Sequence, residues 1–529
     1  MSAAIRDARW PRLAAWLLAL PLLMPVAFLA AGFADIDADL WAHLSRHLLP
    51  QAFANTLALA VLIGLLVMVP GVGFAWASAR YDYPGRRVLD WALVLPLAVP
   101  GYVVAFVYVG LLDFAGPVQT AWRDLFGAQA SLPNGRGLLG AALLLSLVLY
   151  PYVYLLARAS FLRQGSAAMD AARSLGHGPV TAFVRGVLPL TRPAWVAGLT
   201  LAVLEALADF GAVSILGVDT LTTTIYRTWY GQYSLATAAQ LAFGLLGLVA
   251  LVLLVERMAR GRARFAERSV RPQPRRPLRG LAGWTVTLLA SVTVLAGFVI
   301  PVWRLGSWAW HARGGLPMVG EAAFNTLALG ALATALILAI ALGLAYAARR
   351  APGSRTVASA VFVANLGYAV PGTVLAVGAM LWMVHAEGWL AGITGAQLAL
   401  SSSLLAVLVA LSGRFLRVGH GAVDAAFATL RPSLIETART LGASPLRRFV
   451  GVVLPLLRPG LVAGALLVLV EVMKELPATL MLRPFGWDTL AIRVYAFTAE
   501  GMWMEAAWPA LILCGIGLAP VWWLVRQQR

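Results

Sequence analysis

The chain has 529 residues, of which 60% are hydrophobic and only 12% are charged, whereas a soluble domain carries about a quarter charged residues. This composition excludes an ordinary soluble protein and predicts an all-α membrane protein, because apolar runs of about 20 residues, long enough to cross a bilayer as helices, recur along it. The net charge of +18 does not indicate nucleic-acid binding, because the basic residues gather in alternate loops between these runs.

The apolar runs predict about twelve transmembrane helices. In chain order we expect them near residues 13–32, 54–78, 91–112, 137–157, 195–216, 234–256, 281–303, 324–348, 357–383, 397–413, 460–481 and 506–525. The arginine-rich loops alternate, so the positive-inside rule places both termini in the cytoplasm. Residues 1–32 also have the layout of a cleavable signal, but a run of about 20 apolar residues favours a retained first span.

The second half of the chain repeats the first. Offsets of 266 to 271 residues relate the matching segments, which predicts two parallel repeats of about six helices each, residues 1–255 and 281–529. An Arg- and Pro-rich segment, 256–280, is expected to join them as a cytoplasmic linker. Two equivalent halves usually form a pathway at their interface, which favours transport over catalysis. The matching pairs include "FANTLALAVL" (53–62) with "FNTLALGALA" (324–333), "AVPGYVVAF" (98–106) with "AVPGTVLAV" (369–377), and "TLTTTIY" (220–226) with "TLAIRVY" (489–495).

Two cytoplasmic loops are especially similar between the repeats. We call residues 165–193 the first Gly-Pro loop and residues 431–459 the second Gly-Pro loop. Aligned without gaps, residues 170–198 and 436–464 share sixteen of twenty-nine residues. A loop free to drift would not resemble its partner this closely, which indicates a shared role.

The second Gly-Pro loop has readable helix signals. Ser433 and Glu436 predict a capping box at a helix start, and Gly442 suits the left-handed residue that ends a helix. Ser444-Pro445 then predicts the start of another helix. Together these signals predict a short amphipathic helix at the membrane surface, bounded by helix-breaking Gly and Pro residues. From these signals alone it suits lipid headgroups and a groove in another protein equally well.

The pattern acidic-x-Ala-x-x-x-Gly followed by Leu-Pro resembles the "EAA" loop of permease subunits of binding-protein-dependent ABC importers. The matching residues are Asp170, Ala172, Gly176 and Pro189 in the first Gly-Pro loop, and Glu436, Ala438, Gly442 and Pro455 in the second. The resemblance covers nearly the whole chain and implies the type I ABC importer permease fold. It also implies that each loop forms a coupling helix that fits a cleft in an ATPase subunit. Asp170 replaces the family's Glu, and Thr437 replaces its second-position Ala.

The resemblance also implies the partners of the chain. A Walker A loop needs Gly-Lys-Ser/Thr, but the single lysine, Lys474, is flanked by Met473 and Glu475. We therefore expect a transport subunit that is not itself an enzyme and needs no cofactor. Two equivalent loops predict two copies of a separate ABC ATPase. The family implies a periplasmic binding protein as the other partner and the bacterial inner membrane as the location.

Four acidic residues fall well inside predicted membrane helices, away from their ends. Glu205 and Asp209 are spaced i,i+4, as are Glu471 and Glu475 at the equivalent place in the second repeat. A charge near the bilayer centre costs about 2.5–3.5 kcal/mol, so such residues usually face a pathway or a partner. Four converging carboxylates would suit a hard cation. The alternative is structural, with Lys474 neutralising one of them or water reaching some at the cytoplasmic end.

The stretch "ELPATLMLRPFGWDTLAIRVY" (475–495) resembles the equivalent region of ferric-iron ABC permeases, a subfamily in which fused double-length permeases occur. The resemblance implies ferric iron as the substrate, while thiamine or another small solute stays open. A proton-coupled transporter of the major facilitator type is a remote rival, because residues 77–90, "ASARYDYPGRRVLD", partly match that family's loop motif. His43 and His47 have metal-binding spacing, but without a third ligand they more simply indicate an interfacial amphipathic helix.

Overall fold

The chain is almost entirely helical. A computed structural model describes residues 9–260, 275–312 and 319–527, so residues 261–274 of the predicted linker lie outside the described residues. Within these ranges, ten helices are long and apolar enough to cross a membrane, and the bent pair Pro179–Leu190 and Arg192–Ala208 makes an eleventh if it counts as one span. The shorter apolar helix Ala507–Trp522 lies where we expected the twelfth.

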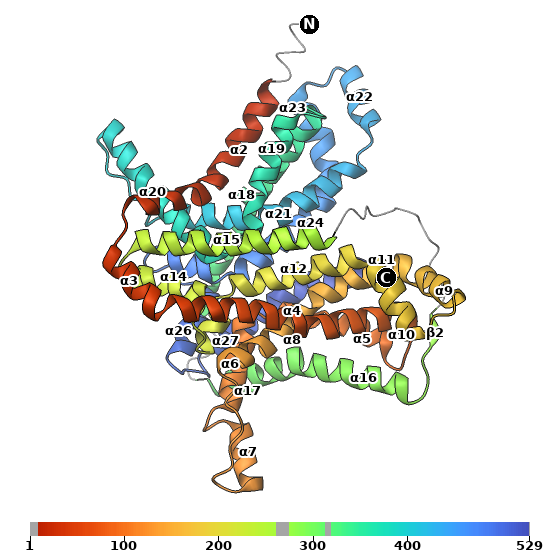
Figure 1. Cartoon of the computed structure of the whole chain (residues 1–529). Helices are drawn as coiled ribbons and strands as arrows, with labels where there is room; N and C mark the ends of the chain where they lie inside the picture. Colours follow the sequence, from red (N-terminus) through yellow and green to blue (C-terminus); the bar gives the residue numbers. More distant parts are fainter. Residues whose placement is uncertain (1–8, 261–274, 313–318, 528–529) are drawn as a thin grey trace. The chain divides into compact units, whose positions relative to one another are not determined.

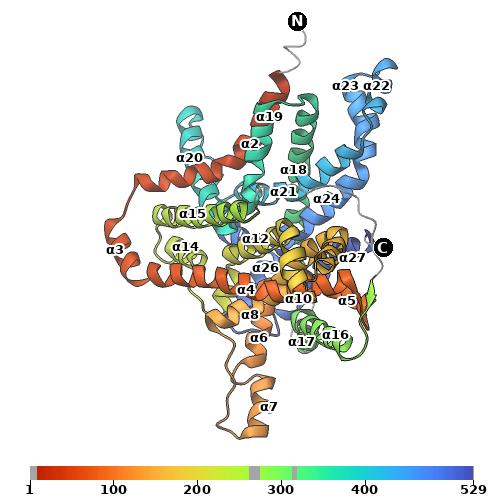
Figure 2. The same ribbon diagram turned by 45° about the vertical axis from the view of Figure 1, so that its right-hand side comes forward.

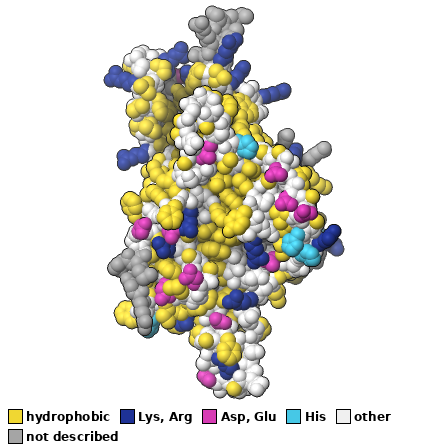
Figure 3. Space-filling view, turned by 90° about the vertical axis from the view of Figure 1, so that its left-hand side faces the viewer, with side chains coloured by type: hydrophobic (Ala, Val, Ile, Leu, Met, Phe, Trp, Pro, Cys, Tyr) yellow, Lys and Arg dark blue, Asp and Glu magenta, His cyan; other side chains and the backbone are white. Residues whose placement is uncertain are grey.

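The helices form two compact units that do not coincide with the two sequence repeats. Unit 1 comprises Met1–Asp37, Thr228–Phe243 and Val319–Ile492, and unit 2 comprises Ala38–Arg227, Gly244–Met318 and Arg493–Arg529. Each unit therefore takes its first helix from the other repeat. Broad hydrophobic areas separate scattered charged side chains on the face drawn in Figure 3, as expected for surface that meets lipid.

Unit 2 contains most of the first repeat. Its helices are α3 (Ala38–His47), α4 (Leu49–Arg80), α5 (Arg86–Ala92), α6 (Gly101–Leu112), α7 (Pro117–Phe126), α8 (Gly137–Ser160), α9 (Ser166–Ser174), α10 (Pro179–Ala182), α11 (Leu188–Leu190), α12 (Arg192–Ala208), α13 (Gly211–Ile215), α16 (Leu281–Val294), α17 (Ile300–His311) and α27 (Ala507–Gln527). Its two short strands, β1 (Tyr81–Asp82) and β2 (Arg276–Pro277), pair in parallel, Tyr81 with Arg276 and Asp82 with Pro277.

Unit 1 contains most of the second repeat. Its helices are α2 (Arg9–Phe28), α18 (Gly320–Arg350), α19 (Arg355–Ala364), α20 (Gly372–Thr394), α21 (Leu404–Thr429), α22 (Pro432–Thr440), α23 (Pro445–Arg448), α24 (Leu454–Lys474) and α25 (Pro477–Leu482). Three further helices contribute residues to both units, namely α14 (Leu221–Tyr230), α15 (Leu235–Arg260) and α26 (Leu490–Ala499).

Both units have the same core. In unit 2, α4, α8 and α12 pack against one another, and in unit 1 the equivalent helices α18, α21 and α24 do the same (Figure 1). The added first helix also lies in a matching place: α2 packs along α19 and α20 in unit 1 (Figure 2), and α16 and α17 pack against α5 and α6 in unit 2. The repeat seen in the sequence is thus a repeat of packing.

The repeated Asn-Thr-Leu segments have a structural explanation. In unit 2, Thr56 Oγ1 accepts a hydrogen bond from Leu221 N at 2.9 Å, and Asn55 Nδ2 donates to Asp219 O at 2.9 Å. In unit 1, Thr326 Oγ1 accepts from Leu490 N at 2.8 Å, and Asn325 Nδ2 donates to Asp488 O at 3.2 Å. Each pair satisfies backbone groups at a helix start that have no partner within the helix. The same two side chains therefore hold the same turn in both units.

Candidate functional site

The first Gly-Pro loop forms a helix–turn–helix. Helix α9 ends at Ser174, and Gly176 follows in the left-handed region with φ +85°. Pro179 then lies in the first turn of α10, and a π-helical turn, Phe183–Val187, leads on to α11. Ala172 is buried, and a Cβ added at Gly186 would lie 3.1 Å from its methyl carbon. Ala172 and Gly186 must therefore both be small for α9 to pack against the π-helical turn.

The second Gly-Pro loop repeats this shape in unit 1. Helix α22 is followed by Gly442 with φ +76° and then by α23, whose first turn holds Pro445. Ser444 Oγ accepts a hydrogen bond from Arg447 N at 3.3 Å and caps α23, which confirms the predicted helix start. A matching π-helical turn, Phe449–Val453, precedes Pro455 in α24.

The predicted capping box of the second Gly-Pro loop is wrong. Ser433 was expected to cap the helix with Glu436 three residues on, but α22 already begins at Pro432 and Arg431 is its N-cap, without a side-chain hydrogen bond. A proline is pre-organised for the first helical position and starts the helix two residues earlier than a cap at Ser433 would. Ser433 lies inside the helix, where its carbonyl accepts from Thr437 Oγ1 at 2.9 Å.

Aromatic rings fix each loop to the rest of its unit. In unit 2, Trp76 of α4 contacts Phe183, with ring centroids 5.0 Å apart. In unit 1, Tyr346 of α18 contacts Phe449 at 5.1 Å. At the tips of the loops, by contrast, large apolar side chains face outward: Leu175 and Val180 are 78% and 75% exposed, and Leu441 and Leu446 are 81% and 73% exposed. Such exposed apolar tips are typical of surfaces that bind a partner.

The acidic residues of the two loops have different surroundings. Asp170 Oδ1 lies 2.9 Å from Arg80 Nη2 and 3.2 Å from Arg276 Nη2. Glu436 is exposed, and within the described ranges it forms no ion pair or hydrogen bond. It lines a cavity of about 290 Å³ together with Arg349, Arg350 and Arg448. The sequence gives no sign of this difference, because the arginines come from distant segments.

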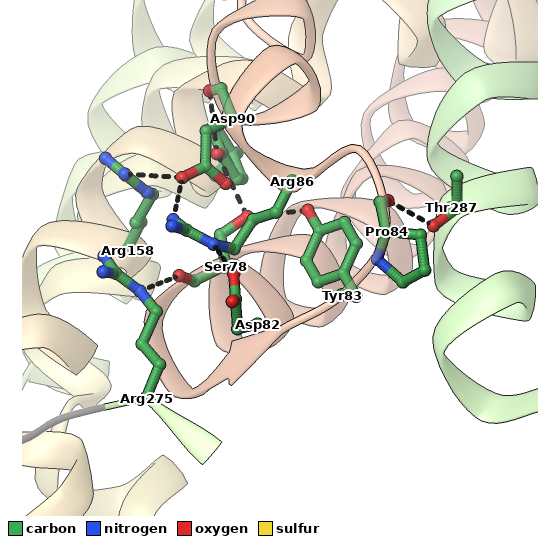
Figure 4. A network of polar contacts seen from close by, with 10 residues as sticks. Ser78, Asp82, Tyr83, Pro84, Arg86, Asp90, Arg158, Arg275 and Thr287 are labelled. Atoms are coloured by element: carbon green, nitrogen blue, oxygen red, sulfur yellow. Dashed lines mark hydrogen bonds and ion pairs between the residues drawn. The ribbon is translucent and has the colours of Figure 1, made fainter. Parts of the chain in front are cut away.

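A polar network gathers at the end of α4 in unit 2 (Figure 4). Arg86 donates to Asp82 at 2.9 Å and to Asp90 at 2.8 Å, and Arg158 donates to the same Asp90 oxygen at 3.2 Å. The hydrogen bond from Arg86 lowers the pKa of the Asp82 carboxyl. Burial lowers the pKa of the Arg275 guanidinium, which donates from Nε to Ser78 O at 3.1 Å. This network joins α4, α5 and α8 to the end of the linker.

The membrane carboxylates lie at helix breaks, where they hold backbone groups. Helix α24 ends at Lys474, and Glu475 accepts hydrogen bonds from Ala478 N at 2.9 Å, Thr479 N at 3.0 Å and Thr479 Oγ1 at 2.7 Å. Helix α12 ends at Ala208, and Asp209 Oδ1 accepts from Val213 N at 3.1 Å. The equivalent carboxylates of the two repeats thus support the short helices α25 and α13.

Their neighbours differ between the units. Glu471 Oε1 lies 3.5 Å from Lys474 Nζ, the partner considered in the structural alternative. Arg414 Nη1 lies 3.6 Å from Glu475 Oε1, beyond hydrogen-bonding distance. Glu205, on α12, is half-buried. The two pairs belong to different units, Glu205 and Asp209 to unit 2 and Glu471 and Glu475 to unit 1, and their role in a pathway stays a prediction.

A glycine contacts the carboxylate in both units, which sequence reasoning missed. A Cβ added at Gly101 would lie 3.4 Å from Asp209 Oδ2, and one added at Gly372 would lie 2.6 Å from Glu475 Oε1. Both glycines belong to the repeated Val-Pro-Gly and begin α6 and α20. The repetition of this tripeptide was visible in the sequence, but the residue that the glycine meets was not.

The histidine pair is placed as the amphipathic interpretation expected. His43 and His47 are exposed on α3, with ring centroids 5.1 Å apart. In the part of the chain that the structure describes, no three His, Cys, Asp or Glu residues are grouped to hold a metal ion.

Comparison with known proteins identifies the family. The family described as "binding-protein-dependent transport system inner membrane component" matches the sequence of this chain twice, at residues 70–261 and 335–526. The chain belongs to this family. It is a permease subunit of an ABC importer and a multi-pass membrane protein, which confirms the predicted fold class and the resemblance and excludes the major facilitator alternative. The two matches also confirm that the family domain occurs once in each half.

The chain is similar along its whole length to one named permease. It is 26% identical over 530 residues to the Fe(3+)-transport system permease protein FbpB 2 of Haemophilus influenzae, covering 98% of both chains. Two of the shorter matches cover 36% and 31% of the chain. They are the sulfate transport system permease protein CysT of Escherichia coli, 29% identical over 68% of its length, and the molybdenum transport system permease protein ModB of the same organism, 32% identical over 69%.

Proposed function

We propose that this permease imports ferric iron, delivered by a periplasmic binding protein. The observation that carries the proposal is the match over 98% of both chains to a permease named for Fe(3+) transport. The sulfate and molybdenum permeases match 31–46% of the chain, so oxyanion import is the second candidate. Thiamine, left open by the sequence, has no support among the relatives described above.

The energy comes from a separate ATPase. In this proposal two copies dock on the two Gly-Pro loops, on the cytoplasmic side, where both termini also lie. The exposed apolar tips form the contact surfaces, and the carboxylates Asp170 and Glu436 lie at equivalent positions on the helix before each tip. The left-handed glycines Gly176 and Gly442 hold each tip at a fixed angle, and Pro189 and Pro455 lie where each loop enters the next helix.

Transport measurements test the substrate. The tagged chain, purified with its co-purifying ATPase and reconstituted into liposomes with the binding protein encoded beside it, should accumulate radioactive ferric iron in an ATP-dependent way. Radioactive molybdate and sulfate serve as competing substrates in the same vesicles. ATP-dependent uptake of molybdate or sulfate without iron uptake would overturn the iron assignment while leaving the importer intact. Iron uptake driven by a proton gradient without any ATPase would contradict the energy source.

A further inference from the structure

The described end of the linker is built into unit 2. Strand β2 pairs with β1, the segment that directly follows α4. Leu278 N donates to Asp82 O at 2.9 Å, and Arg275 Nε donates to Ser78 O at 3.1 Å. Thr287 Oγ1 of α16 then donates to Pro84 O at 2.6 Å, also visible in Figure 4. The end of the predicted linker is thus fixed at several successive points.

The paired strand places Arg276 against the first Gly-Pro loop. Its Nη2 lies 3.2 Å from Asp170 Oδ1, on α9. The same oxygen accepts from Arg80, which is only 5% exposed, at 2.9 Å. Asp170 therefore joins the end of α4, the linker and α9. Two guanidinium groups surround one carboxylate, so this acidic residue carries no uncompensated negative charge.

The second Gly-Pro loop has no such clamp within the described residues. Glu436 occupies the position equivalent to Asp170, with Arg349, Arg350 and Arg448 around the same cavity but no ion pair to it. The two loops share their backbone shape and their aromatic anchor. They differ in the ion pairs of the acidic residue: Asp170 pairs with two arginines, whereas Glu436 forms no ion pair with any described residue.

We propose that the linker is part of the first docking surface: Arg276 is a positioning residue that neutralises Asp170 and holds α9, so that of these two loop carboxylates Glu436 is the one left free for an ATPase. This rests on the proposed function of the loops. The two ATPase copies then meet chemically different surfaces. The first presents apolar side chains held by the linker, and the second presents apolar side chains and an unpaired carboxylate that a cationic group can pair with.

Hydrogen exchange of the purified permease, without any ATPase, tests the clamp. Arg276→Glu should speed exchange of the α9 amides about two- to fivefold, the scale expected for a half-exposed ion pair. Exchange of α22 should not change. Arg276→Lys keeps the charge and should stay near the parent. Arg279→Glu is the matched control, because Arg279 is an exposed linker residue that forms no ion pair with any described residue, and the change in charge is the same.

Cysteine labelling then tests the consequence for docking. Cys514, the only cysteine, is buried, so Leu175→Cys and Leu441→Cys in a Cys514→Ser background report on the two loops separately. The co-purifying ATPase should protect both from maleimide, and Arg276→Glu should weaken protection at residue 175 alone.

The outcomes separate the two proposals. Unchanged α9 exchange in Arg276→Glu, or an equal change in α22, overturns the clamp. Equal loss of protection at both cysteines also overturns it. If the ATPase protects neither cysteine while α9 exchange responds as expected, the clamp stands and the docking role of the loops is wrong.

Discussion

Gly372 lies so close to Glu475 that an added Cβ would come within 2.6 Å of Oε1 and would also meet Arg414 and Pro477. Glu475 is buried and its Oε1 accepts from Ala478 N, so it can make room for the added group only by giving up that hydrogen bond. We expect Gly372→Ala to lower the free energy of unfolding by about 1–3 kcal/mol, the usual cost of overpacking. Thermal unfolding in detergent measures it. Gly388→Ala in the same helix is the control, because a Cβ there meets nothing within 4 Å, and an equal loss in both variants would contradict the explanation.

Replacing Asp209 with Asn removes the charge of the carboxylate and keeps the hydrogen bond that it accepts, so the two roles can be tested separately. Asn keeps an oxygen that accepts from Val213 N and performs about as well as Asp at helix starts, so Asp209→Asn should unfold within about 0.5 kcal/mol of the parent. If the charge serves the pathway, iron uptake should nevertheless fall at least about tenfold, which corresponds to 1.4 kcal/mol. ATPase capture should not change. Normal uptake in this variant would restrict Asp209 to its structural role.

Glu436 offers the clearest test of docking. Glu436→Lys places a cation in a cavity already lined by Arg349, Arg350 and Arg448, and like charges in one site repel. We expect the tagged chain to recover at least about tenfold less ATPase, a loss of about 1.4 kcal/mol. Thr440→Lys adds a lysine at another exposed position of α22 and should recover the ATPase normally. Undiminished recovery with Glu436→Lys would remove this carboxylate from the docking surface.

Thr56 and Thr326 should be equally important for folding. Replacing either with Val leaves a buried backbone N–H, that of Leu221 or Leu490, without its acceptor. The cost of such an unsatisfied donor is about 1–3 kcal/mol. Chemical denaturation should show similar losses for the two Val variants, while Ser, which keeps the hydroxyl, should recover most of the stability. A loss in only one variant would show that the repeated turns are not equivalent.

The sequence predicted the features that depend on local pattern. Apolar runs indicated the membrane helices, because a helix must be apolar over its length to cross a bilayer. The repeated sequence segments indicated two equivalent halves, because a duplicated core needs the same packing residues twice. Local turn chemistry was predicted well at Gly442 and Ser444. It failed at Ser433, where two start signals competed and the proline one residue earlier prevailed.

Contacts between distant segments could not be predicted. Nothing near Asp170 in the chain indicates that Arg80 and Arg276 bind it, because each is about a hundred residues away and is brought there by α4 and β2. The contact of Gly372 with Glu475 was hidden for the same reason. The repeat marked both residues as shared between the halves, but only the fold shows that they touch.

The exchange of first helices between the repeats has a consequence for biogenesis. A ribosome delivers the chain from its N-terminus, so α2 enters the membrane before any of α18–α21, the helices it packs against. Unit 1 has all its segments once Ile492 has emerged, whereas unit 2 still waits for Arg493–Arg529. The unit whose core is synthesised first is therefore completed last, and its early helices must persist in the bilayer as a partly assembled intermediate until Arg493–Arg529 has emerged.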